Sequence, residues 1–276
     1  MTKADLHIHS CCSDGSDTAE ELIQNIKNAQ IDVYALTDHD TVEGCSIMET
    51  LTPDGIKFIA GVELTCLAGN IKCHILGYNC DYKNNILLEL IAKGKILRRK
   101  KLETRLRYLK DVWNICLNKE ESDWLYSRKS IVKTHIAQIL VKRGLAPDNL
   151  SAMQKYLDGC KAGDTRFTIQ EAIKAITKSG GIPVWAHPLG GEGEKHLSES
   201  EFLPKLKQMI SYGIKGLECY YSRYSLQEAE FLVKCAKENS LIVTGGSDYH
   251  GNNKNNIQIG MLNNQGIPIQ AEMFDL

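Results

Sequence analysis

The 276-residue sequence has no apolar run long enough to cross a membrane, and neither sign of charge is in excess. It contains 33 Lys and Arg residues against 34 Asp and Glu residues. This balance argues against the overall basic character of proteins that hold long nucleic acids. The N-terminus also lacks the charged and apolar regions of a signal peptide, so we expect a cytoplasmic protein with no membrane partner.

Cysteine pairs of the CxxC type are also missing, although the chain has 10 cysteines. These cysteines are scattered, and a chain of this length needs no disulfides to hold a small core together. We therefore expect free thiols, most of them acting as small core residues. Hydrophobic residues make up 43% of the sequence, which is enough for a sizeable core.

Short apolar segments alternate with helical patterns along most of the chain. Four Ser/Thr-x-x-Glu sequences, beginning at Thr18, Thr168, Ser198 and Ser225, predict helix starts with capping boxes. The recurring strand–helix order predicts a parallel sheet or a barrel, and polar residues at nearly every strand end favour a TIM-like barrel. The seven predicted strands are residues 4–9, 32–37, 57–64, 71–78, 182–187, 214–220 and 241–246.

The strand–helix alternation breaks between about residues 84 and 164. Leucines and a tryptophan at 102, 106, 109 and 113 repeat at helical spacing, and residues 130–144 form a second helical pattern. We expect a barrel domain of residues 1–83 and 165–276, with residues 84–164 inserted as a helical cap beside its mouth. Residues 93–110 contain nine basic residues and one acid, so Arg98 and Arg99 are candidates for attracting phosphate.

Histidines and carboxylates gather at the ends of the predicted strands. In a strand, residues i and i+2 share a face, so His7 and His9 point to the same side. Burying two imidazoles is costly unless something binds them. Nitrogen and oxygen ligands suit Zn, Mn or Fe, and the size of the set indicates two or three divalent metal ions. The nine candidate ligands are His7, His9, Asp14, His39, Glu63, His74, His187, Asp248 and His250.

Seven short motifs together resemble the PHP (polymerase and histidinol phosphatase) family: DLHIHS, SDG, ALTDHDTVEG, GVE, HILGY, AHP and GSDYHG. The resemblance covers the chain from residue 4 to about residue 251. It implies a distorted seven-stranded barrel with a trinuclear metal centre, in which a metal-bridging hydroxide attacks phosphorus. The implied ligand groups are His7, His9, Glu63 and Asp248; Glu63, His74 and His187; and Asp14, His39 and His250. Among them, the candidate catalytic residues are His7, His9, Glu63, Asp248 and His250. Asp5 and Asp38 are expected to support these ligands from behind.

The predicted insertion is also similar to that of PHP members that act on nucleotides. Those proteins often carry Arg-Pro-His where this chain has Lys133, Thr134 and His135. Lysine lacks the bidentate fork of arginine, so His135 is the leading candidate for a phosphate contact, with Lys133 beside it. The expected substrate is a 3′,5′-bisphosphorylated nucleotide or a short oligonucleotide end, and no obligate protein partner is evident.

Three alternatives stay open at the level of sequence. A histidinol phosphatase of the same family is expected to carry a histidine at the position of Asp14. An amidohydrolase usually places a metal-bridging lysine at the end of a middle strand, and we find none there. A non-catalytic metal-binding module would not require so complete a ligand set. Each alternative differs from the main interpretation in the substrates that it would turn over.

Overall fold

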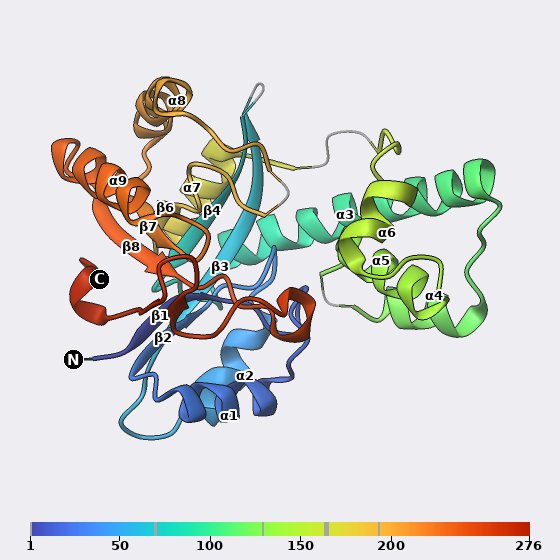
Figure 1. Ribbon diagram of the computed structural model, residues 1–276, viewed down its shortest axis with the longest axis horizontal. Coiled ribbons are helices and arrows are strands. Elements are labelled where there is room, and N and C mark those ends of the chain that lie inside the picture. Colours follow the sequence, from blue (N-terminus) through green and yellow to red (C-terminus); the bar gives the residue numbers. More distant parts are fainter. Residues whose placement is uncertain (1, 69–70, 129, 163–165, 193) are drawn as a thin grey trace.

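The computed structural model describes residues 2–68, 71–128, 130–162, 166–192 and 194–276, and its main feature is a curled sheet (Figure 1). In this sheet seven strands follow one another, and an eighth strand of two residues pairs with one of them. The strand order is β1-β2-β3-β4-β6-β7-β8, which confirms the predicted α/β barrel-like fold. Each of these strands coincides with a predicted one, within a few residues at either end. Their bounds are β1 Ala4–Ile8, β2 Val33–Leu36, β3 Lys57–Ala68, β4 Ile71–Tyr78, β6 Ile182–Trp185, β7 Gly216–Tyr221 and β8 Ile242–Gly246.

The two edge strands of the sheet, β1 and β8, come together and nearly close the barrel. The backbone N–H of Asp248 donates to the carbonyl of His7 at 2.9 Å, and that of His9 donates to the carbonyl of Tyr249 at 2.9 Å. Gly246 permits this approach, because a Cβ atom there would lie 2.3 Å from the Cβ of His7. The closure therefore brings the first and the last candidate metal ligands side by side.

Strand direction departs from the predicted parallel arrangement at β4. The pairs β1–β2, β2–β3, β6–β7 and β7–β8 are parallel, whereas β4 runs antiparallel to both β3 and β6. Only two residues separate β3 from β4, whereas a parallel connection needs a crossover of a dozen or more residues. The long β3–β4 pair consequently places Glu63 and His74 on neighbouring strands rather than at two strand ends.

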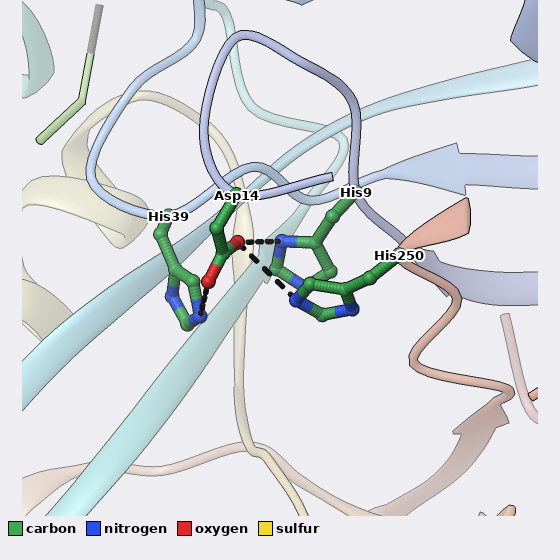
Figure 2. A group of neighbouring side chains, drawn as sticks. All are labelled: His9, Asp14, His39 and His250. Carbon is green, nitrogen blue, oxygen red and sulfur yellow. Dashed lines mark ion pairs between the residues drawn. The ribbon is translucent and has the colours of Figure 1, made fainter. Parts of the chain in front are cut away.

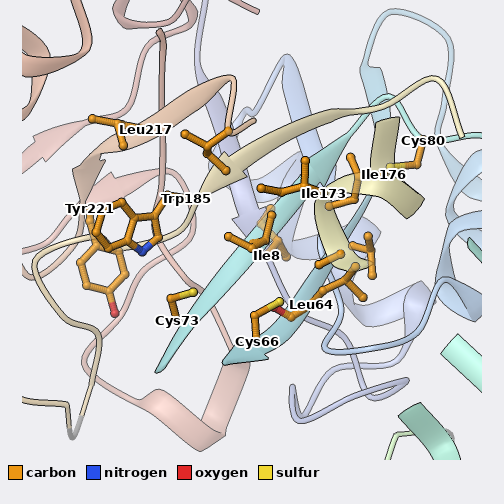
Figure 3. Packing of buried hydrophobic residues seen from close by; sticks show 14 of the residues in the cluster. Ile8, Leu64, Cys66, Cys73, Cys80, Ile173, Ile176, Trp185, Leu217 and Tyr221 are labelled. Carbon is orange, nitrogen blue, oxygen red and sulfur yellow. The ribbon is translucent and has the colours of Figure 1, made fainter. Parts of the chain in front are cut away.

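Five helices cover the outside of the barrel, where the main hydrophobic core lies between them and the sheet (Figure 3). Capping boxes begin α1, α7, α8 and α9, at the four Ser/Thr-x-x-Glu sequences that predicted them. Ile173 and Ile176 of α7 pack against sheet residues such as Leu64. The five helices are α1 Ala19–Ala29, α2 Glu43–Leu51, α7 Ile169–Lys178, α8 Glu199–Tyr212 and α9 Leu226–Glu238.

Four further helices form a separate cluster at one side of the barrel (Figure 1). They have their own core, which includes Leu102, Leu109, Leu125 and Ile136. The first turns of the long helix α3 pack instead in the main core. The residues of this separate core all lie within the stretch 84–164, for which we propose an insertion. The four helices are α3 Asn85–Trp113, α4 Lys119–Tyr126, α5 Lys133–Lys142 and α6 Asn149–Tyr156.

The remaining elements are short and lie mainly near the C-terminus. All 10 cysteines are free thiols, as expected. Among the described residues, no helix is both long and apolar enough to cross a membrane. The short elements are β5 Phe167–Thr168, the 3₁₀ helix η1 Gly251–Lys254, the hairpin strands β9 Met261–Leu262 and β10 Ile267–Pro268, and η2 Ala271–Met273.

Candidate metal centre

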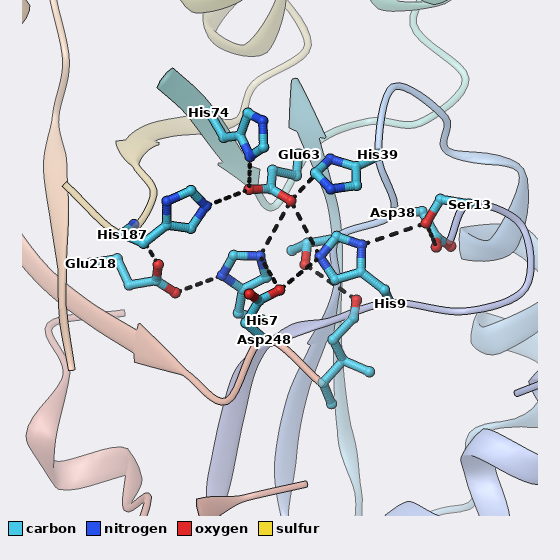
Figure 4. Close-up of polar contacts among 12 residues, drawn as sticks. His7, His9, Ser13, Asp38, His39, Glu63, His74, His187, Glu218 and Asp248 are labelled. Carbon is cyan, nitrogen blue, oxygen red and sulfur yellow. Dashed lines mark hydrogen bonds and ion pairs between the residues drawn. The ribbon is translucent and has the colours of Figure 1, made fainter. Parts of the chain in front are cut away.

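All nine predicted ligands converge on one cluster at the mouth of the barrel, and Glu63 of β3 lies in its middle (Figure 4). The two oxygens of Glu63 face different histidines. Its Oε1 lies 2.9 Å from His74 Nδ1 and 3.2 Å from His187 Nε2. Its Oε2 lies 3.1 Å from His39 Nδ1, 3.2 Å from His9 Nε2 and 3.4 Å from His7 Nε2. A carboxylate placed in this way can bridge two cations.

Asp14 forms a second focus of the cluster (Figure 2). Its Oδ1 lies 3.2 Å from His250 Nε2 and 3.7 Å from His9 Nδ1, and its Oδ2 lies 3.8 Å from His39 Nε2. These four side chains offer ligand atoms that all lie within 4.8 Å of one another. The resemblance implied this group without His9, so the structure adds one histidine to it.

Two more groups have metal-binding spacing, and both contain Glu63. They are His7, His9 and Glu63, and His39, Glu63 and His74. Asp248 lies beside the first group, with Oδ1 3.6 Å from His7 Nε2 and 3.5 Å from His9 Nε2. His187 lies beside the second through its contact with Glu63. The clusters can therefore hold more than one metal ion.

Three buried imidazole nitrogens of the cluster have no hydrogen-bond partner in the part of the chain that the structure describes: His7 Nε2, His9 Nε2 and His39 Nδ1. All three face Glu63 Oε2. A buried polar atom without a partner costs free energy, and neutral imidazole nitrogen is a common metal ligand. The donor set thus fits divalent ions that accept nitrogen and oxygen ligands.

The carboxylates of the cluster are held in their charged form. Burial alone would raise the pKa of Glu63, but His39, His74 and His7 bring it well below its usual range. At Asp14, burial alone would likewise raise the pKa, but His39 and His250 lower it well below its usual range. Burial lowers the pKa of His39 to about 4. Ionised carboxylates and a neutral imidazole are the forms that bind metal.

Three residues at strand ends of the site have left-handed backbone conformations: Asp40 with φ 49°, His187 with φ 29° and Asp248 with φ 60°. A hydrogen bond from the backbone N–H anchors each of them. Asp40 donates to the carbonyl of Glu63 at 2.9 Å, and Asp248 donates to the carbonyl of His7 at 2.9 Å. His187 donates to Glu218 Oε2 at 2.7 Å. Such conformations are costly for non-glycine residues and cluster at functional sites. Here they turn side chains at the ends of three strands toward the mouth.

Asp5 and Asp38, the two predicted supporting residues, lie buried beneath the cluster. Asp5 accepts from the backbone N–H groups of His7 at 3.2 Å, Ser247 at 2.9 Å and Gly260 at 2.7 Å. Asp38 accepts from Ser10 N at 2.8 Å and from Ser13 Oγ at 2.5 Å. Asp5 thus fixes the backbone near His7 and Asp248, and Asp38 fixes the loop that presents Asp14.

The sequence did not single out Glu218, Tyr221 and Lys254, which also contact the cluster. Glu218 Oε1 lies 2.7 Å from His7 Nδ1. Asp248 Oδ2 accepts from Lys254 Nζ at 2.6 Å and from the Tyr221 hydroxyl at 2.9 Å. An acidic residue inside the apolar segment 214–220 was the one available signal for Glu218. Nothing in the sequence pattern distinguishes Tyr221 or Lys254.

A pocket of about 460 Å³ opens above the cluster, between the barrel mouth and the helices α3, α5 and α6. Arg98 and Lys133, two of the predicted phosphate contacts, line it. Arg98 Nε donates to Asp40 Oδ2 at 2.6 Å, and Lys133 pairs with Asp158. Both cations therefore have a carboxylate partner already.

The structure does not bring the other two predicted phosphate contacts to the pocket wall. The Arg99 side chain is 63% exposed, and its guanidinium lies over the Tyr126 ring, 4.8 Å from the centroid. His135 is buried, and its Nδ1 accepts from the backbone N–H of Val132 at 3.3 Å. Its ring also lies against Trp124. His135 was expected to meet substrate because of the family resemblance of the insertion, whereas here its ring is buried and does not line the pocket.

Comparisons with known proteins agree with this geometry. The family model of the PHP domain matches residues 5–177. The chain is 28% identical over 252 residues to the 5′-3′ exoribonuclease Rnm of Escherichia coli, covering 89% of this chain and 84% of that one. It is 27% identical over 267 residues to the 3′,5′-nucleoside bisphosphate phosphatase of Chromobacterium violaceum, covering 94% and 91%.

One solved structure, a candidate metal-dependent phosphoesterase of Bifidobacterium adolescentis, superposes with a TM-score of 0.82. The superposition covers 97% of this chain and 93% of that chain at 24% identity. At this identity the likeness establishes a shared fold. It includes the helical cluster α3–α6, because nearly the whole chain is covered.

Proposed function

Because this chain belongs to the PHP domain family, we propose that it is a metal-dependent phosphoesterase that acts on nucleotides. The substrate class comes from two relatives, one named a 3′,5′-nucleoside bisphosphate phosphatase and the other a 5′-3′ exoribonuclease. Proposed substrates are therefore a 3′,5′-bisphosphorylated nucleotide or the phosphorylated end of a short RNA. The observation with the most weight is Glu63, whose carboxylate faces five imidazoles in a pocket that cations also line.

We propose that the cluster holds two or three divalent ions of Mn, Zn or Fe. Glu63 would bridge two of them, because its two oxygens face separate sets of histidines. The proposed groups are His7, His9, Glu63 and Asp248; Glu63, His74 and His187; and Asp14, His39 and His250, with His9 placed between the first and the third. Asp5 and Asp38 hold the backbone from which these ligands project.

Bound divalent ions supply Lewis-acid polarisation of the phosphate and make water a stronger acid. The chain itself contributes position and charge. Glu218 fixes the ring of His7 through Nδ1, which leaves Nε2 directed at the cluster. Lys254, together with neighbouring histidines, keeps Asp248 ionised against the effect of burial on its pKa. The helical wall beside the pocket excludes water from one side of a bound phosphate ester.

The test of this proposal compares kcat/KM for five substrates with protein loaded with Mn, Zn or Fe in turn. The substrates are adenosine 3′,5′-bisphosphate, its 3′- and 5′-monophosphates, a short 5′-phosphorylated RNA and histidinol phosphate. We expect the nucleotide substrates to exceed histidinol phosphate, and a chelator to abolish turnover. A preference for histidinol phosphate would favour that alternative. Turnover of amides but of no phosphate ester would favour the amidohydrolase alternative, and turnover of nothing would leave a binding module.

Substitution of Glu63 separates the bridging role from general damage. We expect Glu63→Ala to lower kcat/KM by more than about 100-fold and to lose bound metal, because charge stabilisation by the ions disappears with them. His135→Ala, which removes a side chain outside the pocket, should have a smaller effect. His196→Ala is the matched control, since His196 is exposed and pairs with Glu228. An active, metal-replete Glu63→Ala protein would contradict the bridging assignment.

A further inference from the structure

Basic side chains line the same pocket as the histidine cluster. Five come from the helical cluster and from the segment just before β5: Arg98, Lys101, Arg105, Lys133 and Arg166. Two of them already have carboxylate partners, because Arg98 pairs with Asp40 and Lys133 pairs with Asp158. Glu192 and Glu194 also line the pocket, and the charge of Arg166 helps to lower the pKa of Glu194.

Arg105 and Arg166 differ from the two paired cations. Among the described residues, neither guanidinium has a hydrogen-bonded carboxylate, and Arg166 Nη1 is buried with no hydrogen-bond partner at all. Burial lowers the pKa of Arg105 to about 10, and the neighbouring charges of Arg98 and Arg166 add to this effect. Both arginines line the same pocket.

The position of Arg105 follows from the spacing along α3. Residues i, i+3 and i+7 lie on one face of a helix, so Arg98, Lys101 and Arg105 all face the pocket. Arg98 pairs with Asp40, the residue next to His39 of the cluster. Arg105 lies two turns farther along, on the order of 10 Å from Arg98 along the axis. Arg105 thus lies farther along α3 than Arg98, within the same pocket.

A partly buried guanidinium without a counter-ion is costly, and a phosphate is its best geometric partner because both can form two parallel hydrogen bonds. Two such groups that face one space would bind a dianion more tightly than either alone. A phosphate bound there would be held by side chains other than the nine candidate ligands, in the pocket that most of those ligands also line.

We propose that Arg105 and Arg166 bind the non-scissile phosphate of the nucleotide substrate while the histidine cluster acts on the other. The proposal rests on the proposed phosphoesterase function. It assigns substrate selection to two residues outside the motifs shared with the family. It also explains why Arg98 and Lys133, each engaged by a carboxylate, are not sufficient for that task.

The experiment uses the full chain with Arg105→Gln, Arg166→Gln and, as a variant that keeps the charge, Arg166→Lys. Arg107→Gln is the matched control, because Arg107 is an exposed residue of the same helix. One readout is the ratio of kcat/KM for adenosine 3′,5′-bisphosphate to that for the 5′-monophosphate and the 3′-monophosphate. The other is calorimetric binding of adenosine 3′,5′-bisphosphate to chelator-treated protein, with circular dichroism as a check on folding.

We expect each glutamine variant to lower the selectivity ratio and the affinity by about 10- to 100-fold, the usual worth of a hydrogen bond to a charged group. Arg166→Lys should fall between Arg166→Gln and the wild type, and Arg107→Gln should match the wild type. Variants with unchanged ratio and affinity would overturn the proposal while the phosphoesterase function stands. A wild-type protein that hydrolyses no phosphate ester would overturn the function, and calorimetry would then still decide whether the two arginines bind phosphate.

Discussion

Glu218 is the residue that joins two histidines of the cluster from behind. Its Oε1 lies 2.7 Å from His7 Nδ1, and its Oε2 accepts from the backbone N–H of His187 at 2.7 Å. The side chain is fully buried. Burial alone would lower the pKa of His7, but Glu218 and Glu63 raise it well above its usual value. The Glu218 carboxylate therefore orients the ring of His7 and anchors the backbone of His187, and both are predicted ligands.

We expect Glu218→Gln to weaken metal binding by about 10- to 100-fold, because the partners that orient metal-binding histidines typically have effects of this size. A titration with a competing chelator, using zinc and manganese in turn, measures the change. Glu230→Gln is the control, since Glu230 is an exposed residue of α9. Equal affinity in the wild type and in Glu218→Gln would show that the contact with His7 is dispensable.

His135 is not one of the nine candidate ligands, but its pKa gives a pH-dependent contribution to stability, in which burial outweighs the opposing charge of Asp14. Burial lowers its pKa from 6.5 to about 4. Above pH 6.5 the ring is neutral in both the folded and the unfolded chain. Below pH 6.5 the unfolded chain takes up a proton that the folded chain does not, so stability is lost as the pH falls toward about 4. A shift of this size corresponds to on the order of 2–3 kcal/mol.

The free energy of unfolding by urea, measured at pH 7.5 and pH 4.5, tests this contribution in the wild type and in His135→Gln. We expect the wild type to lose on the order of 2–3 kcal/mol more than the variant over this interval. All other titrating groups are shared, so the difference isolates His135. His196→Gln, which removes an exposed histidine, should follow the wild type. Parallel pH profiles for wild type and His135→Gln would show that the buried ring is not held neutral.

At the scale of elements, α3 connects the barrel to the helical cluster, and it crosses β5 at Gly94. A Cβ atom on Gly94 would lie 2.5 Å from Cζ of Phe167, a ring that is itself buried. Alanine normally stabilises a helix interior over glycine by about 0.5–1 kcal/mol. The close contact reverses that preference here, because the ring has little room to move.

We expect Gly94→Ala to destabilise the protein by about 1–3 kcal/mol, the usual cost of overpacking a core. Urea unfolding measures it, and Lys100→Ala, at an exposed position of the same helix, is the control. The double variant Gly94→Ala with Phe167→Leu should recover part of the loss, because the shorter side chain makes room for the methyl group. A Gly94→Ala protein that is more stable than the wild type would exclude this contact.

Elements show clearly what the sequence could and could not predict. Apolar runs and capping boxes located all seven barrel strands and four helix starts, since both signals are local. Strand direction depends on how separate segments pair. The sequence pattern predicted a parallel arrangement, whereas β4 is antiparallel to both of its neighbours. A signal did exist, because the six residues between the predicted strands 57–64 and 71–78 leave no room for a crossover.

The residues of the candidate site also fall into two groups, those that sequence motifs indicate and those that they do not. Histidine and carboxylate positions at strand ends can be read from motifs, and the structure brings all nine together. The contacts of Glu218, Lys254 and Arg166 depend on how distant segments meet, so no pattern in the sequence indicates them. The run of basic residues made both Arg98 and Arg99 candidates for a phosphate contact, whereas only Arg98 lines the pocket.

At the scale of the whole molecule, the net charge is close to zero, but charged side chains of both signs gather in one pocket. The 33 basic and 34 acidic residues almost cancel, yet one pocket gathers the histidines and carboxylates of the cluster together with Arg98, Arg105 and Arg166. Such an arrangement favours a small substrate with two anionic groups over a long polyanion, because attraction for a long strand needs charge spread over a surface.

The metal ligands also span the whole barrel, which predicts that metal removal lowers its thermal stability. They project from or beside β1, β2, β3, β4, β6 and β8, so bound ions would tie six strands together. A ligand present at 1,000 times its Kd stabilises a folded protein by about 4 kcal/mol. For a chain of this size that corresponds to a fall in Tm of about 8–16 °C on chelation. Calorimetry of the metal-loaded and the chelator-treated protein measures the difference.

His196→Ala should show the full shift, whereas Glu63→Gln should show much less, because it lacks the bridging carboxylate. If chelation left the Tm of the wild type unchanged, the cluster would not hold metal tightly in the folded protein, and the proposed role of its nine side chains would have to be abandoned.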